Sequence, residues 1–153
     1  MLGRLYDNEV CSAARALEVV GERWSLLIIR NAMFAGATRF TEFQRRLGIA
    51  PNILANRLER FVEAGLMETR PQPDAPETRE YVLTGKGLDL QPVIIALTHW
   101  GDRWAAPNGP PIIYEHDGCG GTVHQRLSCE ACAATPAPAQ VSARRGPGMP
   151  PGR

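Results

Sequence analysis

Three features are scarce in this chain of 153 residues: lysine, net charge and long apolar runs. Arginine outnumbers lysine sixteen to one among the 17 basic residues, and 16 acidic residues balance them. The balance excludes a global positive field, so any contact with nucleic acid must come from local basic clusters. No stretch approaches the roughly 18 apolar residues that span a bilayer. Residues 1–10 also lack the apolar core of a signal peptide, so we expect a cytoplasmic protein without membrane contact.

Catalytic patterns are equally scarce. The sequence shows no set of Ser, His and Asp, no carboxylate pair placed to form a pocket and no glycine-rich loop that would cradle a phosphate. Enzymes need such groups to move protons, to attack a substrate or to hold a phosphate. We therefore expect that the chain is not an enzyme.

Composition divides the chain into four segments. Residues 1–10 form a short N-terminal arm, and residues 11–104 have apolar positions with helical period, enough for one domain. Residues 105–132 are rich in glycine and carry three of the four cysteines. Residues 133–153 consist mainly of Ala, Pro, Gly and Arg. That last segment has too few apolar side chains to offset chain entropy, so we expect it to be disordered.

Glycine and proline divide the 11–104 segment into elements. We expect helices at 11–20, 23–34, 41–47 and 51–64. Thr41 and Gln44 have the spacing of a capping box, and Pro51 suits a first helical position because it has no N–H to lose. Strands at 66–70 and 80–83 then form a hairpin through a proline-rich connection.

A long last helix is expected after the hairpin, with Thr84 as its cap. Its apolar residues fall three and four positions apart, which places them on one face: Val93, Leu97, Trp100 and Trp104. So small a domain offers this face no obvious partner. We therefore expect the first and last helices to pair across the two-fold axis of a homodimer.

The order of helix, helix, tight turn, helix and hairpin is that of a winged helix-turn-helix. An α-helix fits the major groove of DNA, and the preceding helix fixes its angle across the backbone. The turn, Gly48–Ala50, is short and begins with glycine, as this motif prefers. The arrangement predicts a protein whose partner is double-stranded DNA.

Several stretches also resemble the HxlR-type regulators, which are related to the MarR type. The similar stretches are Cys11–Leu17, Gly21–Ile28, Arg39–Phe43, Pro51–Leu58, Ala64–Leu66 and Tyr81–Gly87. The resemblance implies a cytoplasmic, homodimeric transcription factor that binds a palindromic operator, and some members respond to electrophiles, oxidants or small aromatic effectors. Two positions depart from the family pattern, because Ser12 replaces a proline and Ala50 replaces a serine. Loss of a serine cap costs a helix about 0.5–2 kcal/mol.

The fourth helix is the expected recognition helix. Its buried face would hold Leu54, Leu58 and Phe61, which turns asparagines toward DNA, and asparagine suits bidentate contact with adenine. The predicted DNA-binding residues are Arg39, Thr41, Arg45, Arg46, Pro51, Asn52, Ala55, Asn56, Arg57, Arg60, Arg70 and Arg79. For Arg57 and Arg60, a salt bridge to a neighbouring glutamate remains an open alternative. For the two wing arginines, the alternative is a role in solubility alone.

The cysteines favour metal or redox chemistry over a structural disulfide, because cytoplasmic thiols are kept reduced. Cys11 lies at the first turn of its helix, where partial positive charge can lower a thiol pKa, so it is a candidate redox sensor. The alternative is a small, buried and inert residue. The lone His99, beside Trp100, has no assigned role beyond packing or lining an effector pocket.

The 105–132 segment contains two pairs of candidate metal ligands, each pair with two residues between its members. His116 with Cys119, and Cys129 with Cys132, have the spacing of the two turns of a zinc ribbon. Four such ligands would close the site, so we expect one structural zinc per chain. His124 is a competing ligand, and a redox pair of Cys129 and Cys132 without metal is the alternative.

The sequence thus predicts a mainly α (α+β) fold: a winged helix-turn-helix with a two-stranded wing and a small C-terminal zinc-ribbon-like extension. The leading function is a transcriptional regulator, expected to repress, that responds to a small-molecule or electrophile effector. A dedicated thiol or metal sensor in the same fold is the second interpretation. A protein-interaction module that has lost DNA binding is the third, favoured only by the balanced charge.

Overall fold

The computed structural model describes residues 10–150, so the predicted N-terminal arm lies almost wholly outside the described residues. The chain divides into two compact units between Ile94 and Ile95. Each unit is described by itself. Within the described range, no helix is long and apolar enough to cross a membrane.

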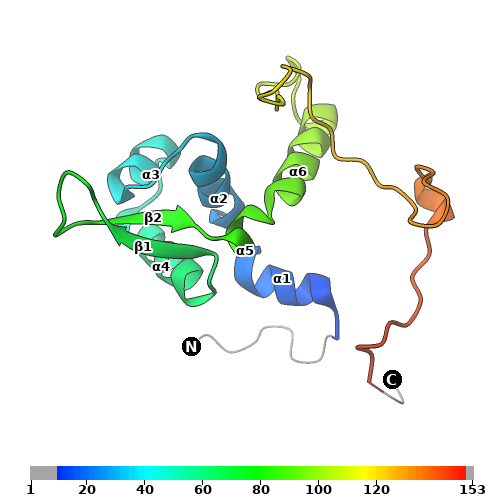
Figure 1. Ribbon diagram of the computed structural model, residues 1–153, viewed down its shortest axis with the longest axis horizontal. Helices are drawn as coiled ribbons and strands as arrows, with labels where there is room; N and C mark the ends of the chain where they lie inside the picture. The colour runs from blue at the N-terminus through cyan, green and yellow to red at the C-terminus, as the bar shows by residue number, and fades with distance from the viewer. Residues whose placement is uncertain (1–9, 151–153) are drawn as a thin grey trace. The chain divides into compact units, whose positions relative to one another are not determined.

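The first unit contains helices and one hairpin. Its elements are α1 (Ser12–Val20), α2 (Ser25–Phe34), α3 (Phe40–Leu47), α4 (Pro51–Glu63), β1 (Met67–Pro71), β2 (Arg79–Leu83) and α5 (Gly85–Leu88). Helix α6 (Gln91–Trp104) begins in this unit and ends in the second. Figure 1 shows α4 next to β1, with α2 and α3 on the side of β2. This is the predicted winged helix-turn-helix order.

The core of the first unit is formed by the apolar faces of α2, α3 and α4. Its most buried side chains are 0–1% exposed: Ile28, Ile29, Phe43, Leu54, Leu58 and Phe61. Burial of such side chains contributes roughly 1.5–3 kcal/mol each. The predicted buried face of α4 is therefore confirmed.

The start of α3 differs from the prediction. The helix begins at Phe40, and Glu42 provides its cap, because Oε2 accepts from the backbone N–H of Thr38 (2.9 Å) and of Arg39 (3.0 Å). The predicted capping box of Thr41 with Gln44 is wrong. A glutamate in the first turn also interacts favourably with the helix dipole.

The predicted long last helix is two helices. Thr84 caps the short α5, where its Oγ1 accepts from the N–H of Gly87 (3.3 Å), and a new helix starts at Gln91. The break has a physical cause in Pro92. In a continuous helix its ring would clash with the carbonyl of Leu88, whereas the first turn of a new helix tolerates it.

The wing is antiparallel, with Met67 opposite Leu83 and Arg70 opposite Glu80. The backbone before α3 joins its other edge, because the N–H of Tyr81 donates to the carbonyl of Thr38 (2.7 Å). Strand β2 therefore lies between β1 and the start of α3. This pairing fixes the wing relative to the helix-turn-helix.

In the second unit, Tyr114 is buried and its hydroxyl lies 3.0 Å from Oγ1 of Thr98 on α6. Glu115 pairs with Thr122 in an isolated β-bridge, so the chain folds back on itself there. Residues 133–150 are mostly exposed, with one short 3-10 turn at Pro138–Gln140. Their disorder stays a prediction, and no zinc ribbon is formed by the described residues.

Candidate nucleic-acid interface

Helices α3 and α4 are joined by a three-residue turn. Gly48 ends α3 in the left-handed conformation (φ +62°), which glycine adopts without strain. Ile49 is buried and anchors the turn in the core. Ala50 then precedes α4 with extended backbone and no side-chain cap, as expected from its missing hydroxyl. The turn therefore has the predicted helix-turn-helix form.

The outward face of α4 begins at its N-terminus. Among the predicted contacts, the exposed residues on this helix are Pro51, Asn52, Ala55 and Asn56. Because Leu54 and Leu58 face the core, these four side chains are turned to solvent. Asn56 also lines a groove of about 450 Å³ that includes Glu18 of α1 and Arg60. Asn52 and Ala55 do not line that groove.

Two arginines occupy the last turn of α3. Arg45 and Arg46 are exposed, and among residues 10–150 neither makes an ion pair within 4.0 Å. Cations at a helix C-terminus interact favourably with its dipole. Both guanidinium groups can thus reach a phosphate without breaking an internal ion pair.

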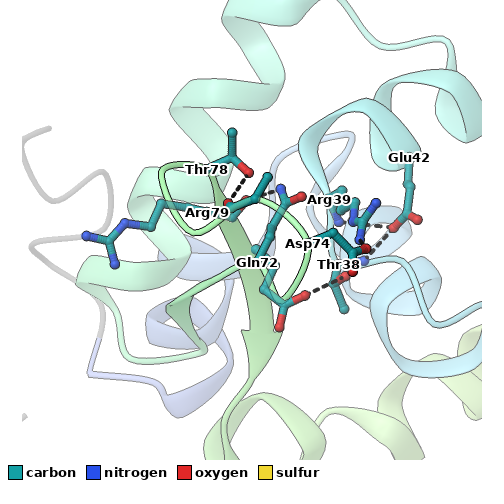
Figure 2. Close-up of polar contacts among 9 residues, drawn as sticks. Thr38, Arg39, Glu42, Gln72, Asp74, Thr78 and Arg79 are labelled. Atoms are coloured by element: carbon teal, nitrogen blue, oxygen red, sulfur yellow. Dashed lines mark hydrogen bonds and ion pairs between the residues drawn. The ribbon is translucent and has the colours of Figure 1, made fainter.

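Arg39 links the start of α3 to the wing loop (Figure 2). Its guanidinium bonds the carboxylate of Asp74 at 3.0 Å, and the two side chains are 39% and 81% exposed. Exposed ion pairs contribute only about 0–1 kcal/mol. A DNA phosphate could therefore replace Asp74 as the partner of Arg39 at little cost.

Arg57 differs from the other predicted contacts. Its side chain is only 15% exposed and bonds Glu22 at 3.1 Å, while its Nε has no partner among the described residues. Of the two alternatives, the structure shows the ion pair. Arg60 is half-buried and lies in the groove beside Glu59 and Glu63.

The wing arginines also differ from each other. Arg70 donates from Nε to the carboxylate of Glu68 (2.8 Å), so it is paired on its own strand. Arg79 is exposed and makes no ion pair within the described residues, and Figure 2 shows it extending away from the loop. Its carbonyl accepts from Nε2 of Gln72 (3.0 Å), which fixes the backbone at this point.

Sequence reasoning missed Glu22 and Asp74, the partners of Arg57 and Arg39. They lie 35 positions from their arginines in both cases, so no local pattern could have revealed them.

Cys11 is exposed and forms the N-cap of α1 with extended backbone. In the second unit, Cys119 and Cys132 are exposed and Cys129 is half-buried. Nδ1 of His116 lies 3.3 Å from Sγ of Cys119. Within residues 10–150, however, no group of three or more His, Cys, Asp or Glu side chains is arranged to hold a metal.

The buried core, the helix-turn-helix and the paired wing together define a winged helix-turn-helix fold. The family model of the HxlR-like helix-turn-helix matches residues 19–109, which is more than half of the chain. The chain belongs to this family.

Relatives support the assignment across most of the chain. The uncharacterized HTH-type transcriptional regulator Rv3095 of Mycobacterium tuberculosis is 44% identical over 149 residues, covering 97% of this chain and 92% of that protein. The HTH-type regulator YodB of Bacillus subtilis is 32% identical over 102 residues, covering 65% and 90%. The crystal structure of PA1607, a proposed transcription factor, has a TM-score of 0.80 at 37% identity, covering 90% and 96%.

The cap of α3 generates a prediction about pH. The N–H groups of Thr38 and Arg39 hold the pKa of Glu42 below its ordinary value of 4.5. A depressed pKa stabilises the fold above the unfolded pKa, and this contribution is lost as pH falls through the folded pKa. Glu42→Gln should therefore destabilise the protein by about 1 kcal/mol at pH 7, the scale of a lost cap.

The measurement is urea unfolding of both proteins at pH 7 and at several values below 4.5. The difference between wild type and Glu42→Gln should shrink as pH falls, because the wild-type carboxylate becomes protonated. Glu77→Gln, in the exposed wing loop, is the matched control and should show no such change. A difference that stayed constant with pH would rule out the charged cap.

Proposed function

We propose that this regulator binds a palindromic operator as a homodimer and represses transcription in the cytoplasm. In this proposal Asn52, Ala55 and Asn56 of α4 face base edges in the major groove. Arg39, Arg45 and Arg46 contact phosphates beside it. Thr41 and Pro51, at the starts of α3 and α4, approach the backbone, and Arg79 of the wing approaches an adjacent phosphate or the minor groove.

The observation that carries the proposal is the sorting of side chains on α4. Leu54, Leu58 and Phe61 are buried, while the two asparagines of α4 are exposed, as are the two arginines in the last turn of the preceding helix α3. Asparagine specifies adenine through two hydrogen bonds, whereas arginine on phosphate supplies affinity without sequence information. Arg57 stabilises α4 through its ion pair with Glu22. Arg60 is half-buried and Arg70 is paired with Glu68, so we expect weaker phosphate contacts from these two residues.

We expect repression because a dimer bound to its operator covers DNA that a polymerase needs. A dimer on a palindrome places its two recognition helices about one helical turn of DNA apart, on one face of the duplex. A dimer bound there obstructs a polymerase that needs the same DNA. A small-molecule or electrophile effector would then release it.

A protein-interaction module remains the alternative from another class, on account of the balanced charge. A salt titration on random duplex DNA separates the two functions, because each phosphate contact releases counterions and steepens the salt dependence. A module without DNA binding would show no such slope.

One prediction concerns base reading. Asn56→Ala and Asn52→Ala are tested on a duplex that the wild-type protein selects from a random library, and on unselected duplex. At least one should weaken binding to the selected duplex by about 1–3 kcal/mol and leave binding to unselected duplex almost unchanged. Arg45→Ala and Arg46→Ala should weaken both together and lower the salt slope by about one each.

Matched controls come from exposed residues elsewhere in the chain. Asn108→Ala and Arg15→Ala should leave both affinities near the wild-type values. If both Asn variants lost affinity equally on the two duplexes, neither asparagine would be a base reader.

The dimer prediction rests on α6. Its apolar face is about half to two-thirds exposed: Val93 (48%), Leu97 (51%), Trp100 (63%) and Trp104 (66%). An apolar patch of this kind favours association. Sedimentation of the wild type at micromolar concentration should give a dimer, and Trp100→Glu combined with Trp104→Glu should give a folded monomer.

Gln91→Glu is the control for added negative charge, because it places a carboxylate on the opposite side of α6. It should remain dimeric. A monomeric wild type, or a double variant that dimerises as before, would remove α6 from the interface.

Redox sensing through Cys11 is a second candidate function, favoured by two observations. The thiol is exposed at the N-cap of α1, so a reagent can reach it. HypR, described as a redox regulator and solved in its reduced form, is 27% identical with a TM-score of 0.52 over 61% of this chain. In this candidate function, oxidation or alkylation of Cys11 regulates operator binding.

If Cys11 is a sensor, a quinone or diamide should modify it faster than free cysteine at pH 7, because an activated thiol has more thiolate. Modification should change affinity for the selected duplex at least several-fold. Mass spectrometry measures the rate and a binding titration measures the affinity, with Cys11→Ser as control. Unchanged DNA binding after complete modification of Cys11 alone would leave it without a sensing role.

A further inference from the structure

Two tight turns in the second unit have different sequences but the same backbone form. In the first, the N–H of His116 donates to the carbonyl of Gly121 (2.9 Å), and the N–H of Gly120 donates back to His116 (2.8 Å). In the second, the N–H of Cys129 donates to Ala134 (2.9 Å), and the N–H of Ala133 donates back to Cys129 (2.8 Å). The donors and acceptors occupy the same positions in both turns.

The left-handed residue also occupies the same position. Gly120 has φ +69° and Ala133 has φ +57°, each the fifth residue of its turn. Glycine adopts this conformation freely, but alanine adopts it at a cost, and Ala133 is the one non-glycine residue with positive φ among residues 10–150. The second turn therefore has the same backbone form as the first, although the left-handed conformation is strained for its alanine.

Each turn brings two potential ligands together at its first and fourth positions. In the first turn, Nδ1 of His116 and Sγ of Cys119 are 3.3 Å apart. A nitrogen and a sulfur bound to one tetrahedral zinc ion, at about 2.0–2.1 Å and 2.3 Å, lie about 3.6 Å apart. The first turn is thus already close to the separation that zinc requires.

In the second turn, the backbone N–H groups of Ala131 and Cys132 are directed at Sγ of Cys129. This turn carries a thiol at its first position and another at its fourth, Cys129 and Cys132. The first turn carries an imidazole and a thiol at the same two positions.

The connection between the turns leaves them free to meet. Residues 122–128 are exposed except for the half-buried Val123. Seven residues can span up to about 25 Å. In this structure the turns remain apart, because no described group of three or more His, Cys, Asp or Glu side chains forms a metal site.

His116 is favoured over His124 as the histidine ligand. The ring of His124 lies 5.2 Å from the ring of His99 on α6, centroid to centroid, whereas His116 is already beside a cysteine in its turn. A Cβ added to Gly121 would make a close contact of 3.3 Å with Sγ of Cys119, so glycine suits this position beside the sulfur.

We propose that His116, Cys119, Cys129 and Cys132 bind one structural zinc ion per chain, which joins the two turns into a small ribbon. On binding, the three thiols lose three protons to solvent and the imidazole coordinates in its neutral form. Four protein ligands complete the tetrahedron, so no position remains open for a reacting water. The ion would replace the hydrophobic core that this short exposed segment lacks.

The test uses the full chain, purified without chelator and analysed for metal. We expect about one zinc per chain, and Cys129→Ser and Cys119→Ser should each lose most of it. After removal of zinc under reducing conditions, titration with Co²⁺ should give the visible absorption of tetrahedral thiolate coordination, saturating at one ion per chain. His116→Ala should weaken Co²⁺ binding at least tenfold, whereas His124→Ala should not.

Cys11→Ser is the matched control for loss of a thiol, and it should retain the full metal content. Circular dichroism and melting of the Cys129→Ser variant should show that the winged helix stays folded, so lost zinc cannot be attributed to unfolding. Full zinc content in Cys129→Ser would overturn the ligand set, and one ion per two chains would overturn a site within one chain. Two further results would overturn the site itself. One is a zinc-free wild type in which the thiols of Cys119, Cys129 and Cys132 still react freely after zinc is added. The other is a disulfide between Cys129 and Cys132 in place of bound metal.

Discussion

The burial of one face of α4 is the constraint on which the rest of the first unit depends. Leu54, Leu58 and Phe61 are at most 1% exposed, and they interlock with the buried faces of α2 and α3. Densely packed side chains cannot rotate freely, so the helix has one rotational setting about its axis. That setting decides which residues face solvent. The exposed asparagines of α4 are therefore positioned by leucines and a phenylalanine that cannot touch DNA.

A second, polar constraint attaches the wing to this helix pair. Glu42 caps α3 through Thr38 and Arg39, and the carbonyl of Thr38 accepts from Tyr81 on β2. The hydroxyl of Thr38 also bonds Glu80 at 3.3 Å. The two residues before α3 are thus hydrogen-bonded to a helix on one side and to a strand on the other. A change in the angle of α3 would be transmitted to the wing through these bonds, so the helix pair and the wing are mechanically coupled.

The sequence predicted the features that depend on local patterns and missed those that depend on distant partners. Helical period identified the buried face of α4, and Gly48 identified the turn, because each signal lies within a few residues. The predicted cap of α3 is wrong because Glu42 accepts hydrogen bonds from two residues that precede the helix, whereas the sequence pattern favours Thr41 as the cap. The break before α6 could have been predicted from Pro92, because proline disfavours a continuous helix even where apolar residues recur with helical period. No local sequence pattern could have predicted the ion pair of Arg57 with Glu22, because only packing of the helices brings the two side chains together.

The arrangement of the arginines resolves the apparent conflict between balanced charge and DNA binding. Arg57 is held by Glu22 in a mostly buried position, so its charge is satisfied inside the fold. Arg39 and Arg70 are paired with exposed acids, and such pairs exchange for a phosphate at little cost. Arg45, Arg46 and Arg79 make no ion pair within the described residues and project from the ends of α3 and β2. The net charge of a chain counts all of these arginines alike, whereas attraction to DNA depends on the few that are exposed and without an internal ion pair. A nearly neutral chain can in this way still present arginines that are ready to contact phosphate.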